Sequence, residues 1–215
     1  MTEPFYKDES VIIYHADCRD VLPDIGTFDL LLTDPPYGID ADNQARILSR
    51  GKLANPKDYG VSDWDGQTVE PSLVSSVRGL CGKQIIFGGN YYNLPPTACW
   101  LVWDKQNGSN DFADCELAWT NLKKAARLKA HLWNGMIRKN NETREHPTQK
   151  PLEVIEWALS LAGDDVETVL DPFAGSGTTG RAAKDLNKKA VLIEREERYC
   201  EVAAKRMSQE VFQWQ

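Results

Sequence analysis

Asp34, Pro35, Pro36 and Tyr37 bring together a carboxylate, two prolines and an aromatic ring directly after the apolar run 28–33. The run has the length of a buried strand, and prolines cannot continue a sheet ladder, so we expect the strand to end at Asp34. The prolines leave carbonyl oxygens without competing N–H groups, Asp34 adds a carboxylate, and Tyr37 adds a flat face. These groups favour a small pocket that accepts hydrogen bonds and stacks on a planar molecule. An Asp-Pro-Pro turn without function is the alternative.

The second group of residues that could do chemistry is the glycine-rich segment 175–180, Gly-Ser-Gly-Thr-Thr-Gly, between a strand pattern and a helix pattern. Glycines let the backbone approach a ligand closely, and a helix N-terminus favours anionic groups. Glu194 ends the next expected strand, where it can accept hydrogen bonds from ribose hydroxyls. By pattern alone this arrangement indicates a nucleoside cofactor, and an NAD-dependent oxidoreductase is the first alternative.

Two observations argue against NAD. The glycine segment begins at residue 175 of 215, which leaves one strand–helix–strand unit rather than two mononucleotide-binding halves. The preceding strand ends in Asp171-Pro172-Phe173, and the Asp171 carboxylate would repel a pyrophosphate. An ammonium or a sulfonium ion is favoured beside the same acid.

Strand and helix patterns alternate along the chain and predict the elements that position these residues. We expect strands at 10–15, 28–33, 84–87, 99–103, 168–171 and 190–194. We expect helices at 71–81, with Gly82 as the cap, and at 151–162, 178–186 and 196–208. Segments 116–120 and 125–133 are expected to form an antiparallel edge. The alternation predicts an α/β protein with a doubly wound, mostly parallel sheet that presents Asp34 at its carboxyl edge.

The composition is that of an ordinary globular protein, with 41% hydrophobic and 27% charged residues. An apolar run of about 18 residues is missing, and so is the pattern of a secretory signal. We therefore expect a cytoplasmic protein without a membrane span. The five cysteines are scattered and no two form a C-x-x-C pair, which argues against a disulfide framework and a zinc site, so no metal is expected.

Charge is distributed unevenly along the chain. The net charge is −7, yet segment 121–150 contains eight basic and two acidic residues, a charge of +6, which leaves −13 on the remainder. An acidic body with one basic segment is compatible with a single surface that faces phosphates, a solvated loop being the alternative. The polar segment 39–66 carries further basic residues and is expected to form a loop over the pocket.

Three motifs in a fixed order resemble those of a known family. They are Asp34-Pro35-Pro36-Tyr37 as a catalytic motif, segment 146–151, His-Pro-Thr-Gln-Lys-Pro, as a cofactor-tail motif, and segment 171–179 as a cofactor loop. Over nearly its whole length the chain resembles S-adenosylmethionine-dependent DNA amino-methyltransferases of the permuted β type, and it is similar to small phage-encoded adenine methyltransferases. The resemblance implies a seven-stranded methyltransferase sheet with an antiparallel edge and a small basic insertion.

The resemblance implies cofactor roles at the matching positions. Glu194 would bind the ribose hydroxyls, and Asp17 the amine of the cofactor's adenine. Asp171 would lie near the ammonium of the methionine part, while Lys150, assisted by Thr148, would pair with its carboxylate. The implied cofactor-binding residues are Asp17, Cys18, Thr148, Lys150, Asp171, Phe173, Gly175, Ser176, Gly177, Thr178 and Glu194.

The implied catalytic residues are Asp34, Pro35, Pro36 and Tyr37. Asp34 and the Pro35 carbonyl would accept the two N–H bonds of a base amine, and Tyr37 would stack on the base. The implied substrate is double-stranded DNA, whose target base must flip out of the duplex to reach such a pocket.

Basic residues in the two polar segments are the candidates for contacts with DNA. They are Arg46, Arg50, Lys52, Lys123, Lys124, Arg127, Arg138, Lys139 and Arg144. Tyr59, Trp64 and Trp133 are further candidates, as side chains that stack or wedge.

We expect one methyltransferase domain over residues 1–215, comprising a catalytic half at 10–120, a target-recognition insert at 121–145 and a cofactor half at 146–215. The resemblance is compatible with a homodimer and with the cytoplasm of a bacterial or phage-infected cell. Adenine is favoured over cytosine because Asp rather than Ser opens the catalytic motif, which is a tendency of the family. An N4-cytosine enzyme, an RNA or protein methyltransferase and an inactive DNA-binding protein remain alternatives beside the oxidoreductase.

Overall fold

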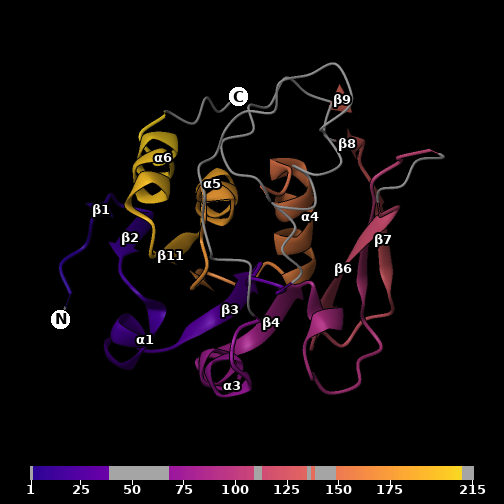
Figure 1. The fold of residues 1–215 in the computed structure, drawn as a ribbon, viewed down its shortest axis with the longest axis horizontal. Coiled ribbons are helices and arrows are strands. Elements are labelled where there is room, and N and C mark those ends of the chain that lie inside the picture. The colour runs from indigo at the N-terminus through magenta and orange to yellow at the C-terminus, as the bar shows by residue number, and fades with distance from the viewer. Residues whose placement is uncertain (1, 39–67, 109–112, 135–136, 139–148, 210–215) are drawn as a thin grey trace.

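A mixed sheet runs through the centre of the computed structural model, which describes residues 2–38, 68–108, 113–134, 137–138 and 149–209 (Figure 1). Its strand order is β1-β2-β11-β10-β3-β4-β6-β5-β7. The strands are β1 (Tyr6–Lys7), β2 (Val11–His15), β3 (Phe28–Thr33), β4 (Cys81–Phe87), β5 (Leu101–Asp104), β6 (Cys115–Thr120), β7 (Arg127–Ala130), β10 (Thr168–Asp171) and β11 (Lys189–Glu194). Two further short strands, β8 (Trp133–Asn134) and β9 (Ile137–Arg138), pair with each other.

Helices cover both faces of the sheet, as the sequence pattern predicts. In Figure 1, α4 (Leu152–Ala162), α5 (Thr178–Asp185) and α6 (Glu197–Met207) lie on one side, while α1 (Cys18–Val21) and α3 (Pro71–Gly79) lie on the other. Short 3₁₀ turns follow α1 at Leu22–Asp24 and β4 at Gly89–Tyr91. The arrangement is a doubly wound α/β fold.

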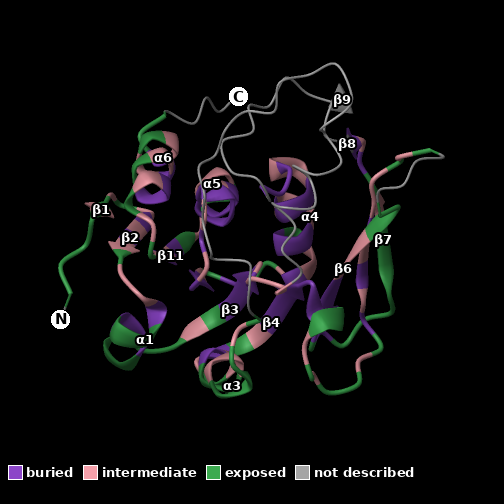
Figure 2. Ribbon diagram, in the orientation of Figure 1, coloured by how far each residue is buried: buried purple, intermediate pink, exposed green. Residues whose placement is uncertain are grey.

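Strand β3 shows how the apolar run at 28–33 serves both layers. Leu30 and Leu32 pack into the core beneath α4, α5 and α6, whereas Leu31 packs into the core beneath α1 and α3. All three are at most 1% exposed. Because side chains alternate across a strand and both faces are covered, the strand is buried without interruption from Leu30 to Thr33 (Figure 2).

The sheet is mostly parallel, with β6 and β1 as the antiparallel strands in its described part. β6 lies between β4 and β5 and is antiparallel to both. Seven strands from β2 to β5 in spatial order form the expected methyltransferase sheet, and β1 and β7 extend it at its two edges. No helix in the described residues is long and apolar enough to cross a membrane.

Two expectations about the elements were wrong, and one strand was missed. β7, within the segment 125–133 expected to be antiparallel, runs parallel to β5, because β5 lies between β6 and β7 in the sheet. α3 ends at Gly79 and is capped at Leu80, since residues 81–83 already pair with β3 in the sheet, so Gly82 is not its cap. β1 was not expected, because a strand of two residues has no recognisable pattern.

Candidate active site

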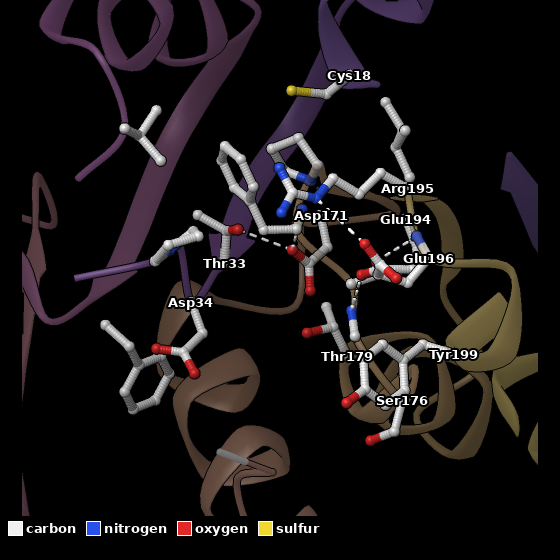
Figure 3. Close-up of a pocket in the computed structure, with 18 of the residues that line it drawn as sticks. Cys18, Thr33, Asp34, Asp171, Ser176, Thr179, Glu194, Arg195, Glu196 and Tyr199 are labelled. Atoms are coloured by element: carbon white, nitrogen blue, oxygen red, sulfur yellow. Dashed lines mark hydrogen bonds and ion pairs between the residues drawn. The ribbon is translucent and has the colours of Figure 1, made fainter. Parts of the chain in front are cut away.

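A cavity of about 530 Å³ lies at the carboxyl ends of β3, β10 and β11. The parallel pairing of these strands brings residues 34, 171 and 194 to one edge of the sheet. Figure 3 shows Asp34 at one end of the cavity, Thr33 and Asp171 in its middle and Glu194 at the other end. Predicted site residues that line it are Asp17, Cys18, Asp34, Pro36, Lys150, Asp171, Phe173, Gly175, Ser176, Thr178 and Glu194.

Asp34 lies at the end of the cavity in a compact network of charges. Its Oδ2 atom is 2.5 Å from the ammonium of Lys150, and its Oδ1 atom accepts a hydrogen bond from the Tyr37 hydroxyl. The same ammonium lies 3.0 Å from Oε2 of Glu116, whose Oε1 atom is 2.5 Å from Lys105. Burial raises the pKa of Asp34, and the attraction of Lys150 limits that rise. Two carboxylates and two ammonium groups therefore balance one another at this end.

Tyr37 is held away from the cavity rather than facing it. Its ring stacks on Tyr91 with centroids 4.9 Å apart, and Tyr92 donates a hydrogen bond to the carbonyl of Pro36. A Cβ atom added to Gly88 would lie 2.0 Å from Cε1 of Tyr37, so the ring rests directly on a glycine backbone. The motif is thus fixed from behind by the segment that follows β4.

Asp171 lies in the middle of the cavity and is only 3% exposed. Its carboxylate accepts hydrogen bonds from the Thr33 hydroxyl at 2.7 Å, from the backbone N–H of Phe173 at 3.1 Å and from the hydroxyl of Thr179. Burial raises the pKa of Asp171 to about 6, although these hydrogen bonds favour the ionised form. A buried carboxylate held by neutral donors is a site at which a cation would be stabilised.

Glu194 ends β11 and anchors the glycine loop. One carboxylate oxygen accepts a hydrogen bond from the N–H of Gly175 at 2.8 Å, and the other accepts one from the N–H of Glu196 at 2.8 Å. Burial raises the pKa of Glu194 as well. Each oxygen keeps a second lone pair, with which it can accept a hydrogen bond from a ligand hydroxyl.

The two glycines of the loop have different tasks. Gly175 has φ +50° and lines the cavity. Gly177, with φ +76°, begins α5, and a Cβ atom there would lie 2.7 Å from Ala203 of α6. Gly177 therefore lets α5 pack against α6 and does not line the cavity, a correction to the expectation that it contacts the cofactor.

Asp17 and Cys18 line the far end of the cavity. Asp17 caps α1 by accepting the N–H of Arg19 at 2.9 Å and forms an ion pair with the guanidinium of Arg19 at 2.6 Å, which lowers the pKa of Asp17. Burial raises the pKa of Cys18 to about 11, so its thiol stays protonated. The helix cap and a ligand contact can share the Asp17 carboxylate.

Lys150 lines the cavity, and the structure pairs its ammonium with two carboxylates of the protein. The expected partner was the carboxylate of the cofactor, but the ammonium is buried between Asp34 and Glu116, beside the catalytic motif. Pro35, in contrast, does not line the cavity; its side chain is buried on the other side of the loop near Val77.

The predicted DNA-contact residues at the end of β6 lie away from the cavity. β6 is antiparallel and carries the chain back to the amino edge of the sheet, where Asn121 bonds to Gly82 and Lys124 bonds to Leu161. Lys123, Lys124 and Arg127 are exposed at this opposite edge, and their contact with DNA stays a prediction. Trp133, expected to stack on DNA, is 8% exposed and belongs to the core.

Some predicted residues lie outside the described part of the chain. They are Arg46, Arg50, Lys52, Tyr59, Trp64, Lys139, Arg144 and Thr148, and for Arg138 only the backbone is described. Within the described residues, no group of histidine, cysteine or acidic side chains is placed to hold a metal ion.

Sequence reasoning missed Thr33, Glu116 and Tyr91. Thr33 directly precedes the catalytic motif, and its position at a strand end could have indicated a side chain at the carboxyl edge. Glu116 and Tyr91 belong to no motif, and only the strand pairing and the turn after β4 bring them to the site.

The chain is similar in sequence to known DNA methyltransferases. Residues 100–205 match the N6_N4_Mtase family, described as DNA methylase. The chain is 26% identical to the Type II methyltransferase M2.LlaDCHI of Lactococcus lactis subsp. cremoris, over 97% of this chain and 93% of that protein. It is also 26% identical to the Type II methyltransferase M2.DpnII of Streptococcus pneumoniae, over 98% and 94% of the two chains.

Two solved structures share the fold. The M1.HpyAVI–SAM complex superposes with a TM-score of 0.61 at 23% identity, covering 93% of this chain and all of that chain. The cytosine-N4-specific PvuII DNA methyltransferase superposes with a TM-score of 0.63 at 16% identity, covering 99% and 91%. The family match, the two relatives and the motifs gathered around one cavity support an S-adenosylmethionine-dependent DNA amino-methyltransferase.

Proposed function

We propose that the enzyme methylates the exocyclic N6 amine of a flipped-out adenine at a specific site in double-stranded DNA. The observation that carries this proposal is the single cavity that Asp34 shares with Asp171 and Glu194. A hydrogen-bond acceptor for a base amine and a buried anionic site for a cofactor thereby open into the same space.

The residues of the cavity fit a cofactor that carries a sulfonium and an ammonium. Asp171 is buried and Glu194 half-buried, both carboxylates have raised pKa values, and a positive charge beside them favours their ionised forms. Asp171, Phe173 and Gly175 would hold the methionine part, Glu194 the ribose and Asp17 the adenine. S-adenosylmethionine supplies an electrophilic methyl group at this site.

In the proposed mechanism, Asp34 accepts one N–H bond of the base amine and the Pro35 carbonyl accepts the other. These acceptors favour a pyramidal nitrogen, whose lone pair is then less delocalised into the base. As the nitrogen gains positive charge, the Asp34 carboxylate stabilises it. Positioning and electrostatics account for the catalysis, and the four charges around Lys150 keep Asp34 in place.

Base stacking on Tyr37 requires a different arrangement from the one in the structure. One face of the ring is covered by Tyr91, whose side chain is 46% exposed. We propose that the target base uses the same stack, beside Tyr37 or in place of Tyr91.

Adenine is proposed as the target because an aspartate opens the Asp34-Pro35-Pro36-Tyr37 motif. The fold itself does not select the base, since the cytosine-N4-specific PvuII enzyme shares it. N4-cytosine methylation is therefore the second candidate.

We further propose that residues 1–215 act as one domain in the cytoplasm of a bacterial or phage-infected cell. The pairing of β3 from the catalytic half with β10 from the cofactor half supports a single unit. A homodimer is proposed only on the family resemblance.

The experiment is transfer of a labelled methyl group from S-adenosylmethionine to DNA, RNA and protein, followed by analysis of the modified nucleosides. We expect N6-methyladenine in DNA. N4-methylcytosine would establish the second candidate, and label in RNA or protein alone would contradict the proposal. A thermal shift with S-adenosylmethionine but not with NAD would exclude the oxidoreductase.

Asp34→Ala tests the proposed role of Asp34 as acceptor of the base amine. We expect methyl transfer to fall by at least about 10³-fold, or about 4 kcal/mol of transition-state stabilisation, because the amine loses its charged acceptor. Binding of S-adenosylmethionine, measured by calorimetry, is expected to persist, since Asp171 and Glu194 lie in the middle and at the other end of the cavity. A variant that transfers methyl groups at the wild-type rate would show that Asp34 is not the acceptor.

A further inference from the structure

Lys150 is a buried lysine whose ammonium is surrounded by oxygens of the catalytic region. Its side chain is 6% exposed, and Nζ lies 2.5 Å from Asp34, 3.0 Å from Glu116 and 3.3 Å from the hydroxyl of Tyr37. The ammonium donates hydrogen bonds to Asp34 and Tyr37 and forms an ion pair with Glu116.

Glu116 is brought to this lysine by the topology of the sheet. β6 is antiparallel to its neighbours, so its first residues lie at the carboxyl edge, opposite Trp103 and Asp104 at the end of β5. Lys105 follows β5 directly and lies 2.5 Å from the second oxygen of Glu116. Burial opposes ionisation of Glu116, but attraction to Lys150 and Lys105 outweighs it and lowers the pKa of Glu116 to about 2.

We propose that Lys150 and Glu116 are positioning residues for Asp34: Glu116 anchors the ammonium of Lys150, and the ammonium fixes the orientation and charge of the Asp34 carboxylate. This inference rests on the proposed function of Asp34 as acceptor of the base amine. Lys150 binds Oδ2 and Tyr37 binds Oδ1, so the carboxylate is held at both oxygens while a further lone pair on each remains for the amine.

The two residues influence the charge of Asp34 in opposite directions. The charged groups near Asp34 in the described residues are Lys150, Glu116 and Asp171, with the Tyr37 hydroxyl bonded to it. Lys150 lowers the pKa of Asp34, whereas the negative charge of Glu116 raises it. Removing Lys150 should therefore move the acid limb of the rate profile to higher pH, and neutralising Glu116 should move it to lower pH.

The experiment compares Glu116→Gln, Lys150→Met and Lys150→Arg with the wild-type protein. Asp165→Asn is the matched control, because Asp165 also pairs with a lysine, Lys83, at 2.6 Å, yet the Asp165 side chain is 76% exposed. For each protein, binding of S-adenosylmethionine is measured by calorimetry, and single-turnover methyl transfer to DNA is measured from pH 5 to pH 9.

We expect Lys150→Met to lower the single-turnover rate at least about tenfold, with the cofactor dissociation constant within about twofold of wild type. Lys150→Arg should recover part of the rate, since it keeps the charge. Glu116→Gln is nearly isosteric, and its shift of the acid limb to lower pH tests the inference even if Lys150→Met does not fold. Asp165→Asn should behave as wild type.

Two results would overturn the inference. One is weakened cofactor binding in Lys150→Met with an unchanged rate at saturating cofactor, which would return Lys150 to a role at the cofactor carboxylate. The other is an acid limb in Glu116→Gln that stays at its wild-type position. Failure of the proposed function is distinguishable, because the wild-type protein and Asp165→Asn would then also leave DNA unmethylated.

Discussion

The two ends of the cavity use carboxylates in opposite ways. At one end, Asp34 and Glu116 share the ammonium of Lys150, and positive and negative charges balance within the protein. From the middle of the cavity to its other end, Asp171 and Glu194 are held by hydroxyl and backbone N–H donors, and burial raises the pKa of both. The first end is organised in advance for a neutral amine, while the second is stabilised when a cation arrives.

Ionised Asp171 has no cationic partner among the described residues of the cavity and lowers the stability of the folded protein. The direction of this effect follows from the raised pKa of Asp171. Its ordinary value of 3.8 rises to about 6 in the folded protein. A raised carboxyl pKa means that the protonated form favours folding, so this stability is fully present below the ordinary value and is lost as the pH rises through about 6. Two pKa units correspond to about 3 kcal/mol as an upper estimate.

Asp171→Asn removes this destabilising charge, and we expect it to change stability and cofactor affinity more than the two variants below. The amide oxygen can still accept the Thr33 hydroxyl, so we expect the variant to be more stable than wild type by about 1–3 kcal/mol at pH 7. The gain should vanish near pH 4. Affinity for S-adenosylmethionine should fall by about 100-fold, because the ionic attraction is lost.

Melting temperatures between pH 4 and pH 8 and calorimetric titration with the cofactor check both parts of this prediction. Asp165→Asn is the control, since its carboxylate is exposed and lies outside the cavity. Unchanged cofactor affinity in Asp171→Asn would show that the Asp171 carboxylate does not attract the cofactor.

Gly88→Ala tests the Asp34 end of the cavity, because Gly88 contacts the ring of Tyr37. The added Cβ atom would lie 2.0 Å from the Tyr37 ring, and the residue has φ +63°. We expect methyl transfer to fall about tenfold, because Tyr37 must move away from Asp34. Gly26→Ala is the control for backbone strain, with φ +76° and no atom within 4 Å of the new Cβ.

Both glycine variants should lose about 1–2 kcal/mol of stability from the left-handed conformation. Methyl-transfer rates at saturating cofactor and chemical unfolding separate the two effects. Equal rates in Gly88→Ala and Gly26→Ala would show that the contact with Tyr37 does not position Asp34.

Thr33→Val should have the smallest effect. It removes the hydroxyl that donates to Asp171 at 2.7 Å while keeping the shape of the side chain. The pKa of Asp171 should rise further, since the lost hydrogen bond favoured the ionised form, and stability at pH 7 should fall by about 1 kcal/mol. The pH dependence of melting measures this shift; an inflection at or below the wild-type position would contradict it.

Local sequence predicted the parts of the site that depend on neighbouring residues. The apolar run before Asp34 and the prolines after it define a strand end, and the glycines before α5 with the acid after β11 define a nucleoside-binding loop. Strand alternation then predicted the carboxyl edge at which Asp34, Asp171 and Glu194 meet.

The partners of those residues depended on long-range pairing that no local pattern contains. The sequence determined which chemistry Asp34, Asp171 and Glu194 can do, because residue type and strand position set it. Only the tertiary structure decided that Lys150 serves Asp34, that Glu116 reaches the site and that Lys123 does not. The reason is the antiparallel course of β6: it places its beginning at the cavity and its end at the opposite edge, and this direction is set by pairing with β4 and β5.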